Sequence, residues 1–219
     1  MKHVFVETNW VVEYGAPAHL RPSTALTLAD RAAAGGLRLY IPSICLTEAQ
    51  HPIRKNFNPR SPCDSVRRYL SWASTKGILN AEDSETVRRL LDKYETTVGV
   101  ELDQLAERLA LLRNHPGIEI FPLSEEMLVR AVELSIENPD LEPFDQAILA
   151  AVLVRARALR DLGADDIAFC EPDGHLLPWD KKTGGIKQPL AALYDAAGVR
   201  VYIDFAMESH SKGSGFPEQ

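Results

Sequence analysis

The sequence has few cysteines and no long hydrophobic run. Cys45, Cys63 and Cys170 are odd in number and far apart, which argues against a disulfide framework or a zinc site and favours reduced thiols. No stretch approaches the roughly 20 apolar residues that a membrane-spanning helix needs. The apolar run within residues 1–7 is also too short for a signal peptide. We therefore predict a cytoplasmic protein with no membrane partner.

Glycine-rich phosphate loops and an excess of positive charge are also missing. The pairs Gly35-Gly36 and Gly184-Gly185 lack the spacing and the lysine of a nucleotide-binding loop, and nothing resembles a nucleophile elbow. The formal net charge of −7 argues against a protein coated in positive charge for tight nucleic-acid binding. A nuclease stays compatible with this charge, because a bound metal ion offsets the negative charge of its acidic ligands.

Short β-branched and aromatic runs alternate with helical patterns along the chain. With 219 residues and 45% hydrophobic content, the chain can bury the core of one domain. The alternation predicts an α/β fold, a three-layer α/β/α sandwich around a central parallel sheet. The predicted strands are residues 4–6, 37–41, 118–121, 166–170 and 199–203.

The longest helical pattern runs from residue 61 to residue 114. Apolar residues at three-and-four spacing between Val87 and Leu112 form one stripe, which we interpret as core or as the face of a homodimer. We predict one domain over residues 1–208, with a helical insertion at about 55–115 and a flexible tail at 209–219. The other predicted helices are residues 26–34, a helix from 43 that carries Glu48, 124–136, 143–159 and 190–197.

Three acidic residues stand in short apolar contexts far apart in the sequence. Glu7 ends the first predicted strand, Glu48 lies in the helix after the second strand, and Asp145 opens the helix that begins at Pro143. Burying a carboxylate is costly unless it is paired or bound to a metal ion. Ligands of parallel sheets gather at the carboxyl ends of the strands. We therefore predict that these carboxylates converge on a divalent cation.

A fourth acid follows the fourth predicted strand, and two residues compete for this place. Glu171 is closer to the strand, whereas Asp173 agrees better with the acid spacing, although Pro172-Asp173-Gly174 is also an ordinary turn. Thr8 and Asn9 are predicted to orient the ligands and a water molecule. His175, in the same loop, has no evident partner and is interpreted as a lone histidine.

An all-carboxylate site suits Mg²⁺ or Mn²⁺ better than zinc, because hard cations prefer oxygen ligands. One or two such ions would bind a phosphodiester, activate a water molecule and stabilise the leaving oxygen. The simpler alternative is that Glu48 is a solvated helix residue and that Asp145 is an acid favoured by the positive end of its helix.

Taken in order, these motifs resemble the PIN-domain family of metal-dependent nucleases. Glu7-Thr8-Asn9 matches the Asp-(Thr/Ser)-Asn that follows the first strand of that family, and Glu48 and Asp145 match its second and third acids. The resemblance covers roughly residues 3–50 and 117–205. Glu7 replaces the usual aspartate, which extends the carboxylate by about 1.5 Å. The stretch 169–174 lacks the usual hydroxyl and closing phenylalanine of the fourth-acid motif.

The resemblance implies a Mg²⁺- or Mn²⁺-dependent endonuclease that acts on nucleic acid, with RNA favoured. Its catalytic set would be Glu7, Glu48, Asp145 and Asp173, with Glu171 as a further metal ligand. A toxin role with an antitoxin-like protein partner is compatible with it. The alternatives are a degenerate PIN-like domain that binds nucleic acid or protein without cleavage, and a two-metal phosphohydrolase acting on small phosphates.

A basic stretch follows the predicted Glu48 helix. Arg54, Lys55 and Arg60 are accompanied by further arginines and by only one acid, Asp64. Such a stretch is predicted to guide a phosphate backbone toward the acidic site. The alternative is an ordinary solvated surface loop.

Overall fold

The computed structural model describes residues 1–137 and 140–207, so the predicted tail at 209–219 lies outside the described residues. Helices and strands alternate as the sequence predicts. In chain order, the elements are β1 (Lys2–Val6), α1 (Thr8–Gly15), the 3-10 helix η1 (Ala18–Leu20), α2 (Ser23–Ala33), β2 (Leu37–Pro42), α3 (Ser43–Asn56), α4 (Arg60–Thr75), α5 (Ala81–Asp103), α6 (Leu105–Leu111), the 3-10 helix η2 (Leu112–Asn114), β3 (Ile118–Phe121), α7 (Glu125–Glu137), α8 (Pro143–Asp161), β4 (Ile167–Cys170), α9 (Leu190–Ala197) and β5 (Val199–Tyr202).

The five strands form one sheet in the order β3-β2-β1-β4-β5, and every pair is parallel. In the central strand, Val4 pairs with Leu39 on one side and with Ala168 on the other. All three side chains are fully buried, which is expected when helices cover both faces of a parallel sheet. The predicted α/β fold with a parallel sheet is confirmed.

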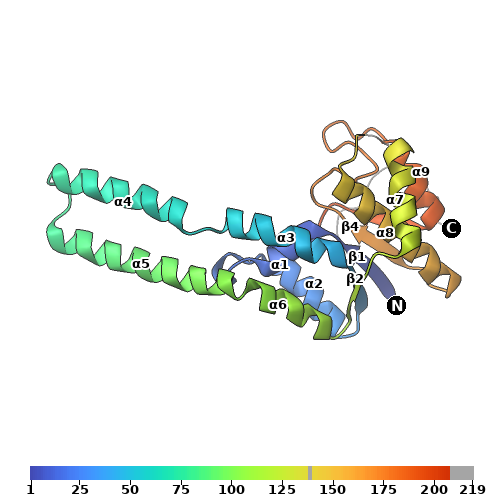
Figure 1. Cartoon of the computed structure of the whole chain (residues 1–219), viewed down its shortest axis with the longest axis horizontal. Helices are drawn as coiled ribbons and strands as arrows, with labels where there is room; N and C mark the ends of the chain where they lie inside the picture. Colours follow the sequence, from blue (N-terminus) through green and yellow to red (C-terminus); the bar gives the residue numbers. More distant parts are fainter. Residues whose placement is uncertain (138–139, 208–219) are drawn as a thin grey trace.

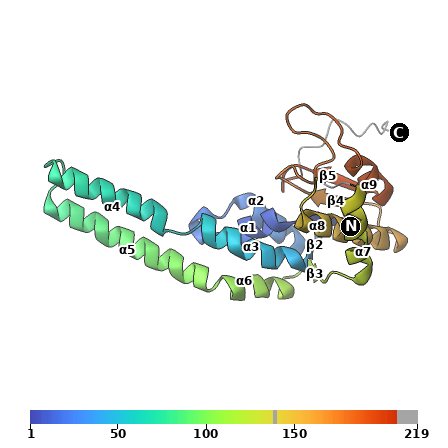
Figure 2. The same cartoon turned by 45° about the horizontal axis from the view of Figure 1, so that its top comes forward.

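Helices cover the sheet in two layers (Figures 1 and 2). Helices α1, α2, α3 and α6 lie on one side of the sheet, and α7, α8 and α9 lie on the other. The sheet and both layers contribute to one hydrophobic cluster, which includes Phe5, Leu39, Leu149 and Phe169. This is the predicted three-layer sandwich. Among the described residues, no helix combines the length and the apolar character needed to cross a membrane.

Helices α4 and α5 project from the sandwich as an antiparallel hairpin (Figures 1 and 2). The predicted helical pattern at 61–114 is therefore not continuous. Gly77, at φ 67°, turns the chain after α4, and the Asn80 side chain accepts a hydrogen bond from the Asp83 backbone N–H to start α5. The outer part of the predicted stripe, around Val87 and Tyr94, is half-buried in the hairpin. Its inner part, including Leu105 and Leu112, belongs to the main core.

Helix α1 was missed in the sequence prediction. It follows strand β1 after one residue, and Glu7 caps it because its Oε2 accepts a hydrogen bond from the Asn9 backbone N–H at 2.8 Å. Trp10 and Val11 bury the inner face of this short helix. The β-branched run on both sides of Glu7 concealed the change from strand to helix periodicity. Glutamate is also not among the usual N-cap residues, so Glu7 gave no sequence signal for the start of this helix.

Candidate functional site

The acidic residues gather where two neighbouring strands of the sheet end. Val6 of β1 pairs with Cys170 of β4, so the next residues, Glu7 and Glu171, leave the sheet side by side. The chain runs outward from β1 to β2 and β3 on one side, and through β4 to β5 on the other. Such a reversal of strand order opens a crevice beyond the carboxyl ends of the two strands, where open α/β sheets bind their ligands.

Glu7 is a buried carboxylate that is only partly satisfied. Its side chain is 6% exposed, and Oε2 accepts the Asn9 N–H, whereas Oε1 is buried and has no hydrogen-bond partner among the described residues. Burial raises the pKa of Glu7 to about 8, and the negative charges of Glu171 and Asp173 add to this effect, whereas the backbone N–H and the side chain of Asn9 oppose it. Within residues 1–137 and 140–207, no ion pair with a cation stabilises the ionised form of Glu7.

Glu48 reaches the same region from helix α3, which packs directly against α1. The Thr8 hydroxyl donates a short hydrogen bond to Glu48 Oε2. Thr8 is buried, so this contact fixes the Glu48 carboxylate against the start of α1. Thr8 and Asn9 thus each contact one of the acids, Thr8 through its hydroxyl and Asn9 through its backbone N–H.

Asp145 lies in the first turn of α8, and the His175 side chain lies next to it. Burial raises the pKa of Asp145, His175 opposes the rise, and the nearby charge of Glu48 adds to it. The His175 Nδ1 lies 3.5 Å from Asp145 Oδ2, and its Nε2 lies 4.0 Å from Asp173 Oδ2. The interpretation of His175 as a lone histidine was therefore wrong. Its position two residues after Asp173, in the fourth-acid loop, was the available signal.

Glu171 and Asp173 occupy different depths of this site. Glu171 is buried, burial raises its pKa, and both of its carboxylate oxygens lie 2.9 Å from the Gly174 backbone nitrogen, which donates to them. The Asp173 side chain is 55% exposed. The negative charges of both Glu171 and Asp173 act on Glu7. The two candidates for the fourth acid thus lie in one neighbourhood, Glu171 at the strand end and Asp173 at its solvent-facing side.

The acids approach one another without forming a closed set of metal ligands. Within residues 1–137 and 140–207, no group of three or more His, Cys, Asp or Glu side chains is arranged to hold a metal ion. Glu48 contacts Thr8, Asp145 contacts His175, and Glu171 contacts the Gly174 N–H. The unpartnered oxygen of Glu7 is the feature of this site that best fits a cation, because a carboxylate oxygen is the ligand type that Mg²⁺ and Mn²⁺ prefer.

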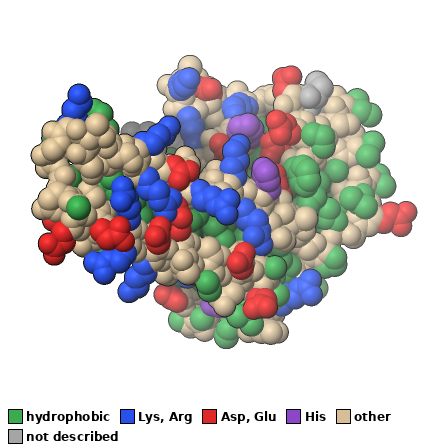
Figure 3. Space-filling model, turned by 60° about the vertical axis from the view of Figure 1, so that its left-hand side comes forward, with side chains coloured by type: hydrophobic (Ala, Val, Ile, Leu, Met, Phe, Trp, Pro, Cys, Tyr) green, Lys and Arg blue, Asp and Glu red, His purple; other side chains and the backbone are tan. Residues whose placement is uncertain are grey.

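The predicted substrate-binding cations lie where α3 meets the hairpin. Arg54 and Lys55 are in the last turn of α3, Arg60 begins α4, and all three are exposed. Lys55 follows Glu48 by seven residues, so the two share one side of α3. Figure 3 shows Lys and Arg side chains in a band across the face that includes the hairpin, close to acidic and histidine side chains.

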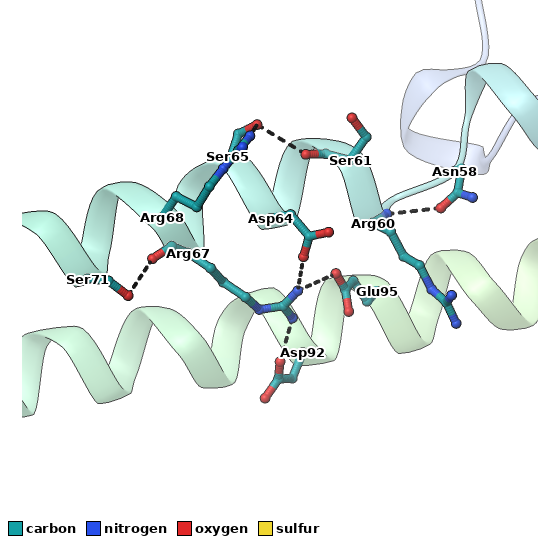
Figure 4. A network of polar contacts seen from close by, with 10 residues as sticks. All are labelled: Asn58, Arg60, Ser61, Asp64, Ser65, Arg67, Arg68, Ser71, Asp92 and Glu95. Carbon is teal, nitrogen blue, oxygen red and sulfur yellow. Dashed lines mark hydrogen bonds and ion pairs between the residues drawn. The ribbon is translucent and has the colours of Figure 1, made fainter.

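Acidic residues of α5 also face these cations. Arg54 and Arg60 line a shallow hollow together with Glu95 and Asp103. In Figure 4 the Arg60 side chain extends toward α5, and its charge contributes to lowering the pKa of Glu95, for which Arg67 is the main cause. Part of the positive charge is therefore balanced within the protein.

Two lysines hold the loop that carries Glu171 and Asp173. Lys187 Nζ donates to the Gly174 carbonyl oxygen at 2.8 Å, and Lys181 Nζ donates to the Pro172 carbonyl oxygen. The Lys181 charge also opposes the rise in the pKa of Glu171. These lysines bring positive charge to the edge of the acidic cluster.

Comparisons of this chain with protein-family models, with curated proteins and with solved structures each find no match. The resemblance to PIN domains therefore stays a prediction carried by the motifs and their placement.

Proposed function

We propose that this protein is a Mg²⁺- or Mn²⁺-dependent endonuclease that hydrolyses phosphodiester bonds, with RNA as the favoured substrate. The observation that carries the proposal is the buried Glu7 Oε1, which has no hydrogen-bond partner among the described residues, at a position where Glu7 and Glu171 follow the paired ends of β1 and β4. Burying a carboxylate among other carboxylates destabilises its ionised form. A divalent cation would offset that cost.

The residues of the chain fit such an ion in their chemistry. Glu7, Glu48 and Asp145 would hold it directly or through water, together with Glu171 or Asp173. The Asn9 N–H binds Glu7 Oε2, which leaves Oε1 for the ion, and the Thr8 hydroxyl keeps Glu48 oriented. When bound, the ion would neutralise phosphate charge and lower the pKa of a coordinated water molecule.

Exposed cations beside the site would bind the substrate backbone. Arg54, Lys55 and Arg60 lie on the α3 side of the acids and would contact phosphates next to the scissile bond. The preference for RNA, and a toxin role with an antitoxin-like protein partner, rest on the PIN-domain resemblance alone.

Cleavage of labelled structured RNA and of single-stranded DNA with Mn²⁺ tests this proposal. Wild type is compared with Asp145→Asn and with a control, Asp161→Asn, which changes an exposed aspartate at the other end of α8. We expect Mn²⁺-dependent cutting by wild type and by the control, and a loss of at least about a hundredfold in Asp145→Asn, because charge stabilisation by the metal ion is worth several kcal/mol. Equal cutting by both variants would remove Asp145 from the site.

The second candidate is a degenerate PIN-like domain that binds nucleic acid or a protein without cleaving. Three acids already contact groups of the protein itself, and no ready ligand set exists among the described residues. Thermal unfolding with and without Mn²⁺ discriminates the two, because a ligand that binds only the folded state raises its stability. Neither cutting nor stabilisation by Mn²⁺ would favour the degenerate domain.

A further inference from the structure

Two large aromatic side chains of α4 lie next to each other on the surface of the hairpin. Tyr69 is 54% exposed and Trp72 is 51% exposed, and their ring centroids are 5.8 Å apart. Leu70 and Ala73 of the same helix are buried, and α4 packs against α5. The hairpin is therefore closed by other side chains, and the Tyr69 and Trp72 rings present much of their surface to solvent.

Polar and basic side chains accompany the two rings on the outer face of α4, by which we mean the face turned away from α5. Intervals of three or four residues place them in one row along the helix and its C-terminal end. The row consists of Ser61, Ser65, Arg68, Trp72 and Lys76, all of which are exposed, and Tyr69 lies beside it. None of these side chains is acidic, so the outer face combines aromatic rings, hydroxyls and positive charge.

The positive charge of Arg68 is not neutralised within the described part of the chain. Figure 4 shows Arg67 extending toward α5, where it contacts Glu95, whereas Arg68 points away from α5 beside Ser65. The Arg68 guanidinium lies 3.2 Å from the Ser65 hydroxyl and forms no ion pair with any described residue. Its charge is therefore available to an anion from solution.

The two helices of the hairpin carry opposite charge. Helix α4 contains three arginines and one acid, whereas α5 contains seven acids and three basic residues. A polyanion is attracted by the first and repelled by the second. The charges of the hairpin therefore direct such a ligand to the outer face of α4.

Exposed aromatic rings together with cations are the means by which proteins hold single-stranded nucleic acid. The bases of a single strand can stack on aromatic side chains, whereas the bases of a duplex are covered by their neighbours. Helix α4 has 16 residues and is therefore about 24 Å long, which leaves room for several nucleotides. In Figures 1 and 2 it extends from the end of α3 away from the sandwich.

We propose that the outer face of α4 binds a single-stranded stretch of the nucleic acid, with bases stacked on Tyr69 and Trp72 and phosphates bound by Arg68 and Lys76. This inference rests on the proposed function, because it identifies the bound strand as the substrate of the acidic site. Arg60, at the start of α4, lies between the cations of α3 and this face. The substrate would therefore need an unpaired segment beside the bond that is cut.

Binding measured without metal ions tests the proposal separately from cleavage. A labelled single-stranded RNA of about 16 nucleotides and the matching duplex are titrated in EDTA and followed by fluorescence anisotropy. Wild type is expected to bind the single strand more tightly than the duplex. Trp72→Ala should raise the dissociation constant for the single strand at least about fivefold, because it removes a stacking surface. The matched control is Leu90→Ala, which shortens a 62% exposed leucine of α5 and should not change binding.

The phosphate contact has its own measurement. Arg68→Ala should reduce the slope of log affinity against log salt by about 0.7, as expected for one phosphate contact with a single strand. Arg89→Ala, which removes an exposed arginine of α5, should leave the slope unchanged.

Tryptophan fluorescence shows whether a base stacks on Trp72 itself. Single-stranded RNA should quench part of the emission of wild type, and this part should be absent in Trp72→Phe. The phenylalanine ring can still stack, so Trp72→Phe should keep most of the affinity that Trp72→Ala loses. A change in thermal unfolding is not expected for either variant, because Trp72 is exposed.

Several results would overturn the proposal. Wild type might be replaced by Trp72→Ala without any loss of affinity, the duplex could bind as tightly as the single strand, or no strand could bind at all. The last result would leave the face to a different partner, such as a protein. Mn²⁺-dependent cutting that is unaffected by Trp72→Ala contradicts the role of α4 alone, whereas Trp72-dependent binding without any cutting contradicts only the nuclease.

Discussion

The sandwich and the α4–α5 hairpin are stabilised in different ways. The sandwich contains one continuous hydrophobic cluster, to which the sheet and both helix layers contribute. In the hairpin, Cys63, Leu70 and Ala73 of α4 are buried, but among the described residues they lie outside that cluster. A rigid core can hold buried carboxylates at the strand ends, whereas the hairpin has little apolar burial to resist local opening.

Ion pairs between α4 and α5 contribute to the stability of the hairpin (Figure 4). Arg67 of α4 contacts Asp64 at 3.2 Å, Asp92 at 2.8 Å and Glu95 at 2.7 Å, and so ties the two helices together. Its hydrogen bond with Glu95 is the main cause that raises the pKa of Arg67 and lowers that of Glu95. Partly exposed pairs of this kind are weak and are screened by salt. The sandwich therefore holds its side chains in fixed positions, whereas the hairpin can open locally at a lower free-energy cost.

The largest expected effect concerns Glu7 in the sandwich. Its folded pKa is about 8 and its reference value is 4.5, so between these pH values the folded protein holds a proton that the unfolded chain has released. The free energy of unfolding of the metal-free protein therefore falls as pH rises from about 4.5 to about 8, by at most about 5 kcal/mol. Glu7→Gln should remove this part of the slope in denaturant unfolding measured across that range.

Asp145 and Glu171 also have raised pKa values, so the free energy of unfolding of the Glu7→Gln variant still depends on pH. The quantity to compare is thus the difference in slope between wild type and Glu7→Gln. Identical slopes would mean that Glu7 is not buried in its uncharged form.

The next largest effect is expected from shortening a buried leucine, and it should differ between the sandwich and the hairpin. Leu149→Ala, at a fully buried position of α8, should lower the global free energy of unfolding by about 2–5 kcal/mol. Leu70→Ala, in the seam of the hairpin, should mainly speed hydrogen exchange of α4 and α5 and change the global transition much less. Equal global losses would show that the hairpin unfolds together with the sandwich.

A smaller effect is expected from the cations at the joint between the two regions. Replacing Arg54 and Lys55 by alanine should weaken nucleic-acid binding several-fold and reduce the slope of log affinity against log salt by about 2. The matched variant replaces Arg88 and Arg89, two exposed cations on the hairpin. If this second variant has the larger effect, the substrate path follows the hairpin and not α3.

The smallest effect should follow Arg67→Ala. Removing this side chain leaves Asp92 and Glu95 without their cation, and we expect faster hydrogen exchange in α4 and α5 with little change in the melting temperature of the whole protein. High salt should reduce the difference between the variant and wild type, because it screens the same pairs. A difference that is independent of salt would point to the packing of the arginine stem.

Much of the fold was predictable because its signals are local. The strand at Ile118–Phe121 and the helix at Leu190–Ala197 have the predicted bounds, and Ser124 Oγ accepts the Met127 N–H as an N-cap should. The prediction failed where local signals conflict. Helix α1 begins one residue after a strand, and the long helical pattern conceals the turn at Gly77.

The acidic residues of the candidate site could be picked out from the sequence, but His175 and the contacts between the side chains could not. The apolar surroundings of Glu7, Glu48 and Asp145 indicated carboxylates near a core, because polar groups enter such positions only for a structural or chemical reason. The pairing of Asp145 with His175, and the contact of Thr8 with Glu48, join segments that only the packing of helices and loop brings together.

The sequence by itself determined the alternation of strands and helices and the acids at their ends, since period and capping act over a few residues. Tertiary structure alone decided the strand order that sets Glu7 beside Glu171, the depth at which each acid is buried, and the exposure of Tyr69 and Trp72 on α4. These properties depend on which distant surfaces exclude water together, and the spacing of residues along one segment does not specify that.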